Sequence, residues 1–170
     1  MAKFGARVGY GQVEPNHLSA QRTSQIYAQL PADNEVFTDG RLENGQFVKY
    51  SYADGKVNLA GKGEWMMVFN EVKLYDDRWR ESYADYAMKA SDSVDGIMVP
   101  RVIKTNVGDI YTTNAVDPAA DTAKGNKLTP TVEAKGFLAH AEGTEDMVWQ
   151  VVAETTMPDG KKAVKLQRIK

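Results

Sequence analysis

The chain has 170 residues, 42% of them hydrophobic, so it can bury one core of ordinary size and its length requires no second domain. Its 21 basic and 23 acidic residues give a formal charge of −2, which supplies no electrostatic attraction to nucleic acid or to an anionic membrane. The absence of cysteine excludes disulfides, thiolate nucleophiles and thiolate metal ligands. No apolar run approaches the roughly 20 residues that cross a bilayer, so we expect a soluble protein with neither a nucleic-acid nor a membrane partner.

Residues 1–34 form a first segment, in which glycine and proline interrupt any sustained hydrophobic period. Its apolar residues, among them Phe4 and Tyr10, are spaced as isolated anchors. We therefore predict an extended N-terminal arm that becomes ordered when it docks on another surface, with Phe4 and Tyr10 as contact residues. A mobile terminus is the alternative interpretation. Within this segment, residues 19–30 favour a short helix before Pro31.

Residues 35–170 have a different sequence pattern, in which short β-prone runs are separated by Asp-Gly and Asn-Gly pairs. Such pairs tolerate the positive φ angles of tight hairpin turns. The pattern predicts a single β-rich domain over this range. The clearest hairpin of the first half runs through residues 47–52, turns at Asp54-Gly55 and returns through residues 56–60. The pairs begin at Asp39, Asn44, Asp54, Asp95 and Asp159.

The stretch from Glu64 to Tyr75 predicts one long strand at the centre of this domain. Residues 65–69 are all apolar, which indicates that both faces of the strand are covered there. Residues 71–74 alternate between charged and apolar, which is typical of a strand with one face in water.

After this strand, residues 76–90 predict one short helical insert, because Trp79, Tyr83 and Tyr86 recur at helical spacing. The aromatic stripe either packs on the protein's own sheet or contacts a neighbouring subunit. We therefore include Trp79, Tyr83 and Tyr86 among the candidate interaction residues.

The second half of the chain predicts further strands. A terminal hairpin is indicated by the alternation over residues 147–154 and 164–167 around a turn at residues 158–160. Pro100 places its own strand at an edge or a bulge. The other expected elements are a buried strand over 97–104, a turn and β-branched strand over 107–114, a long exposed loop over 115–126, and short strands over 127–134 and 136–141.

The residues that usually carry catalysis or metal binding do not assemble in this sequence. His17 and His140 are the only histidines, and no cysteine supplements them, so we expect no tetrahedral metal site. The oxygen-rich residues 91–96 do not have the spacing of a calcium loop and read as Asx turns. Adjacent acids such as Glu145 and Asp146 point apart on a strand, which disfavours glycoside hydrolysis. We expect no catalytic, cofactor-binding or metal site, and a protein that is not an enzyme.

Residues 36–135 alternate between turn-forming and strand-forming stretches and contain two short motifs. These are Glu43-Asn44-Gly45-Gln46-Phe47-Val48 and Gly108-Asp109-Ile110-Tyr111-Thr112-Thr113-Asn114. This stretch resembles the small β-rich decoration or auxiliary capsid proteins of tailed-bacteriophage heads. The resemblance implies a β-barrel or β-tulip domain on the capsid surface of the virion, made in the host cytoplasm. It also implies binding to the major capsid protein lattice, an arm threading between capsomers, and self-association into oligomers. The helical insert departs from the smallest such domains.

The sequence thus predicts a mainly β fold, an antiparallel β-barrel or sandwich of β-tulip type, with an extended N-terminal arm and one short helical insert. The first functional hypothesis is a non-enzymatic virion protein that stabilises the phage head across neighbouring capsid subunits. The alternative is a β-sandwich binding module for carbohydrate or a host surface. Its stacking platform would be one of Trp79, Tyr83, Tyr86 and Trp149.

Overall fold

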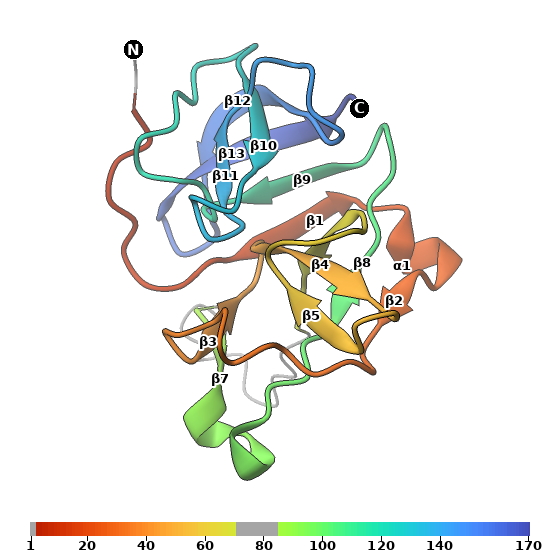
Figure 1. Cartoon of the computed structure of the whole chain (residues 1–170). Coiled ribbons are helices and arrows are strands. Elements are labelled where there is room, and N and C mark those ends of the chain that lie inside the picture. Colours follow the sequence, from red (N-terminus) through yellow and green to blue (C-terminus); the bar gives the residue numbers. More distant parts are fainter. Residues whose placement is uncertain (1–2, 71–84) are drawn as a thin grey trace.

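The computed structural model describes residues 3–70 and 85–170 (Figure 1). These residues are mainly β, and all pairs between named strands are antiparallel. The strands in chain order are β1 (Val13–His17), β2 (Ile26–Tyr27), β3 (Arg41–Glu43), β4 (Phe47–Ser51), β5 (Lys56–Asn58), β6 (Trp65–Val68), β7 (Ala87–Lys89), β8 (Val102–Ile103), β9 (Ile110–Thr113), β10 (Lys127–Pro130), β11 (Leu138–His140), β12 (Trp149–Thr156) and β13 (Lys162–Arg168). The helical pieces are α1 (Ala20–Thr23) and the 3-10 turns η2 (Ala90–Asp92) and η3 (Val94–Gly96).

A six-stranded sheet in the order β1-β9-β13-β12-β10-β11 contains the terminal hairpin β12–β13. This confirms the hairpin that the alternation predicted. Val151 pairs with Leu166, but the next pair is Ala153 with Lys165, so Val152 is the extra residue of a β-bulge.

A five-stranded sheet in the order β2-β8-β6-β4-β5 contains the other predicted hairpin, β4–β5. Its turn includes Gly55 at a φ of +66°, as the Asp-Gly pair predicts. A separate two-stranded pair joins β3 to β7.

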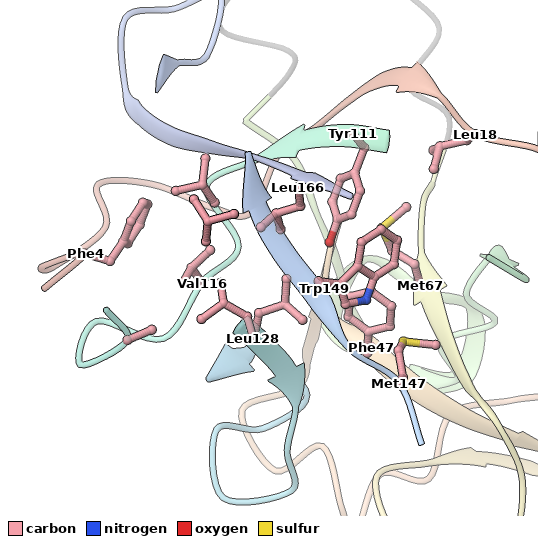
Figure 2. Packing of buried hydrophobic residues seen from close by; sticks show 14 of the residues in the cluster. Phe4, Leu18, Phe47, Met67, Tyr111, Val116, Leu128, Met147, Trp149 and Leu166 are labelled. Atoms are coloured by element: carbon pink, nitrogen blue, oxygen red, sulfur yellow. The ribbon is translucent and has the colours of Figure 1, made fainter. Parts of the chain in front are cut away.

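The main hydrophobic core lies between the two larger sheets (Figure 2). Trp149 of β12 is fully buried at its centre. Its ring lies 4.9 Å from that of Tyr111 on β9 and 5.9 Å from that of Phe47 on β4, measured between ring centroids. Because β4 and β12 belong to different sheets, these aromatic contacts hold the sheets together.

The five-stranded sheet is buried on both faces. Phe47 and Met67 enter the core between the sheets, whereas their chain neighbours Val48 and Val68 enter a second core on the other face. The prediction that residues 65–69 are covered on both sides is confirmed for Met67 and Val68, whereas Trp65 and Met66 of the same strand are half-buried. The strand expected over Glu64–Tyr75 is shorter in the structure, since β6 ends at Val68; residues 71–75 lie outside the described part of the chain.

The N-terminal segment differs from the expected arm, because residues 3–34 pack against their own domain. Phe4 is only 6% exposed and belongs to the main core. Strand β1 pairs with β9 and β2 pairs with β8, so the segment extends both sheets. The helix expected over residues 19–30 is reduced to α1, which ends at Ser24 in the left-handed conformation.

Three further expectations are corrected. Residues 87–89 form strand β7 instead of the end of a helix, because they pair with β3; residues 76–84 lie outside the described part. The strand expected over 97–104 is confined to β8, which lies between β2 and β6 and begins after Pro100. The loop 115–126 is not generally exposed. Ala115, Val116, Ala120 and Thr122 are buried.

Candidate functional site

Residues 4–12, here called the N-terminal strap, run along the surface between two anchored ends. At the first end the Phe4 N–H donates to the carbonyl oxygen of Ala120 over 2.9 Å. At the second end the Gln12 N–H donates to Asn114 Oδ1 over 2.7 Å. In Figure 1 the strap is the red segment that leads from the N-terminus into β1.

A pocket of about 640 Å³ lies beside the strap. We call it the Tyr10 pocket. Its walls come from the strap, from β3, from the segment between β9 and β10, and from Phe137 just before β11. The lining residues are Ala6, Arg7, Gly9, Tyr10, Arg41, Glu43, Val116, Pro118 and Phe137.

A largely buried ion pair lines this pocket. An Arg7 terminal nitrogen lies 2.5 Å from Glu43 Oε2, and the two side chains are 16% and 4% exposed. Arg41 Nε lies 3.3 Å from the other oxygen of Glu43. Burial lowers the pKa of Arg7 and Arg41 lowers it further, against the opposing effect of Glu43. Arg7 also stacks over Phe137, with its guanidinium carbon 4.6 Å from the ring centroid.

The Tyr10 ring is flanked by two cations. The guanidinium carbon of Arg41 lies 5.8 Å from the ring centroid, and Lys89 Nζ lies 5.6 Å from it. Arg41 and Lys89 are direct cross-strand partners in the β3–β7 pair, so both side chains project from the same face. The Tyr10 N–H donates to Asp85 Oδ1 over 2.5 Å.

A second hollowed region surrounds Trp65, at the start of β6. Two depressions of about 410 and 260 Å³ share Trp65, Asp146 and Met147 in their linings. We call them the Trp65 groove. Lys49 Nζ lies 4.9 Å from the centroid of the Trp65 ring. His140, which the sequence placed in no site, also lines the groove.

The predicted interaction residues do not form one surface. Phe4 is buried in the core, and Tyr10 is half-buried and lines its pocket. Tyr86 is half-buried and does not line the Tyr10 pocket. Trp79 and Tyr83 lie outside the described residues. Trp149, named as a possible stacking platform, is fully buried and cannot serve as one.

Sequence reasoning missed Arg7, Arg41, Glu43 and Trp65. Arg41 and Glu43 are separated by one residue just before the Asn44-Gly45 turn, and this spacing places them on the same face of a strand. That signal was available. No local sequence pattern identifies Arg7 as a site residue. It contacts Glu43 only because the strap runs past β3.

Over residues 3–70 and 85–170, no group of three or more His, Asp or Glu side chains is arranged to hold a metal ion. Among the same residues, no helix is long and apolar enough to span a membrane. Comparison with protein-family models, curated proteins and solved structures gives no match to this chain.

Proposed function

We propose that this protein is a non-enzymatic virion component, a decoration or auxiliary protein that stabilises a phage head by binding across neighbouring major capsid subunits. The observation that carries the proposal is an exposed aliphatic turn between β7 and β8. Val94, Ile97 and Val99 are 84%, 49% and 40% exposed within six residues of chain. We call this feature the Val94 turn. Apolar side chains gathered in this way are typical of surfaces that another protein covers.

The turn is held in place by contacts with the domain. Asp95 and Gly96 have φ angles of +54° and +70°, and the Ile97 N–H donates to the Val94 carbonyl oxygen over 3.0 Å. Asn34 Nδ2 donates to the Gly96 carbonyl oxygen over 3.2 Å. Met98 is fully buried beside the exposed residues. A turn fixed at its base can present Val94 and Ile97 to a partner with little loss of conformational entropy.

Two further points support the proposal. The resemblance of residues 36–135 to phage head decoration proteins implies this role. The two large sheets share one core, so the domain is mainly β, as the resemblance implies. In Figure 1 the Val94 turn is part of the green segment beyond β7, away from the six-stranded sheet. It can therefore face the capsid lattice, or a second copy in an oligomer, while that sheet faces outward.

Co-sedimentation with phage particles tests the proposal. The wild-type protein should pellet with the heads at a copy number set by the capsid lattice. The double variant Val94→Asp, Ile97→Asp should lose about tenfold or more in apparent affinity, because two buried aliphatic contacts are replaced by charges. Val107→Asp is the matched control, since Val107 is 66% exposed on another turn. Failure of the wild type to pellet would refute the proposed function, and equal pelleting of all three proteins would refute the Val94 turn as its contact surface.

The Trp65 groove favours a second candidate function, the binding of carbohydrate. Saccharides stack on aromatic rings and hydrogen-bond to neighbouring carboxylates. The half-buried Trp65 and the exposed Asp146 line the same groove, and no described residue hydrogen-bonds to the Asp146 carboxylate.

Titration with chitooligosaccharides and maltooligosaccharides, followed by isothermal titration calorimetry, tests this candidate. Binding should be saturable in the wild type, lost in Trp65→Ala and kept in Tyr52→Ala. Tyr52 carries a 61% exposed ring outside the groove. Absence of any saturable change in the wild type would count against the groove as a site for these sugars.

A further inference from the structure

The Tyr10 pocket has more cationic than anionic groups. Its lining holds two guanidinium groups, on Arg7 and Arg41, and one carboxylate, on Glu43. Lys89 adds a third cation over the Tyr10 ring. The nearby Asp85 offsets this excess only in part: its charge acts on Arg7, but it also pairs with Lys161 over 3.3 Å and accepts the Tyr10 N–H.

Glu43 is fully occupied by its present partners. Its Oε2 atom accepts hydrogen bonds from Arg7 and from the Gly11 N–H, the latter over 2.8 Å. Its Oε1 atom faces Arg41 Nε. The side chain is 4% exposed, so it cannot move to neutralise Lys89 without leaving Arg7 buried and unpaired.

The β3–β7 pair therefore places two like charges directly opposite each other, an arrangement that is unfavourable in a sheet. Lys89 makes no ion pair with any described residue, and the Tyr10 ring is the group that faces its ammonium. Arg41 is 47% exposed and uses only Nε toward Glu43. Within the described part of the chain, nothing hydrogen-bonds to its two terminal nitrogens, which together form a fork suited to a carboxylate.

The remaining walls of the pocket are apolar. Val116, Pro118 and the Phe137 ring, which lies under the Arg7 guanidinium, line it as well. A bare inorganic ion would leave these groups uncovered in a pocket of about 640 Å³. A carboxylate carried on a hydrocarbon side chain, with an apolar neighbour, satisfies both the cations and the apolar walls.

We propose that the Tyr10 pocket is a docking site for an acidic segment of a partner polypeptide, whose carboxylate binds Arg41 and Lys89 while its apolar side chain packs on Phe137. The segment approaches along the strap and displaces no described ion pair. Val94, Ile97 and Val99 do not line this pocket, so the proposal is tested independently of the contact assigned to the Val94 turn.

The test uses the full chain labelled with ¹⁵N and the blocked peptide acetyl-Glu-Phe-Glu-amide. Saturable shifts should appear at the amides of Tyr10 and Gly11 and at the Arg41 side-chain Nε–H. The neutral peptide acetyl-Gln-Phe-Gln-amide should bind about tenfold more weakly, and added salt should weaken the acidic peptide because the attraction is partly exposed. Inorganic phosphate alone should bind more weakly than the acidic peptide.

Substitutions assign the binding to the two cations. Arg41→Met should weaken binding of the acidic peptide about fivefold or more, and Lys89→Met about threefold. Arg41→Lys should weaken binding less than Arg41→Met does, since lysine keeps the charge but not the planar fork of donors. Arg22→Met on α1 is the matched control and should change affinity less than about twofold. If Arg41→Met perturbs the fold, the affinity of Lys89→Met for the acidic peptide decides the outcome.

Three results would overturn the proposal. One is equal binding of the glutamine peptide. Another is tighter binding of phosphate than of the acidic peptide, which would make the pocket a phosphate site. The third is unchanged affinity in both Arg41→Met and Lys89→Met.

Discussion

Gly136 shows how much of the packing between the sheets depends on a single residue. It lies in the turn between β10 and β11, where its carbonyl oxygen accepts the Phe47 N–H over 2.8 Å. A Cβ atom at this position would lie 2.0 Å from the Phe47 carbonyl oxygen, and the φ angle is +82°. Only glycine lets the backbone of this turn approach β4 so closely.

Gly136→Ala should therefore lower the free energy of unfolding by about 3 kcal/mol or more, because backbone strain adds to a collision with a backbone oxygen. Gly160→Ala provides the control. Its φ angle is also +82°, but no atom lies within 4 Å of the added Cβ. We expect it to cost about 1 to 2 kcal/mol from the left-handed conformation alone. Urea denaturation measures the free energy of unfolding of both variants. Equal decreases in the two variants would show that the close approach of Gly136 to Phe47 does not add to the cost of the substitution.

At the scale of the elements, the hairpins β4–β5 and β12–β13 were predictable because their information is local. Each combines alternating or apolar strands with an Asp-Gly turn whose glycine has a positive φ. The burial of both faces at residues 65–68 was predictable for the same reason, since an uninterrupted apolar run leaves no face for water.

The elements that sequence reasoning missed depend on distant partners. Strand β7 has aromatic residues before it at helical spacing, but its pairing with Arg41–Glu43 decides its conformation. Phe4 looked like an anchor for another molecule, and the chain's own loop at Ala120 provides the docking surface instead. The Tyr10 pocket was only partly visible in the sequence, because it joins the strap to β3 and to the segment around Phe137.

At the scale of the whole molecule, ion pairs connect segments that are distant in the sequence. Asp33 pairs with Lys56 and Asp39 with Lys135, and in each case the hydrogen bond from lysine is the main cause that lowers the pKa of the aspartate. Burial alone would raise the pKa of Asp159, but hydrogen bonds from Gln12 and Lys161 outweigh burial and lower it. Asp159 thus connects the terminal hairpin to the strap.

These lowered pKa values predict acid sensitivity. A carboxyl group whose pKa is lower in the folded state than its ordinary value of 3.8 stabilises the fold above that value and loses its contribution as the pH falls through the folded pKa. The free energy of unfolding should therefore decline below a pH of about 4. The decline should be smaller in Asp159→Asn, which is less stable than the wild type at neutral pH.

Urea denaturation at a series of pH values checks this expectation. The difference in stability between the wild type and Asp159→Asn should shrink as the pH falls. Asp54→Asn serves as the control, because Asp54 is exposed and forms no ion pair with a described residue. A constant difference between the wild type and Asp159→Asn across the series would contradict the role given to Asp159.

The pairing of Val13 with Thr113 also constrains the order in which the chain can fold as it is synthesised. Strand β1 leaves the ribosome well before β9, which itself needs the still later β13 on its other side. The six-stranded sheet can therefore close only after β13 has been released, and such distant contacts make folding slow. While it waits, β1 is protected from pairing with other chains by Pro15, which cannot donate a hydrogen bond, and by its exposed polar residues Glu14 and Asn16. The composition of this edge strand thus suits a segment that must remain unpaired until β9 and β13 have been made.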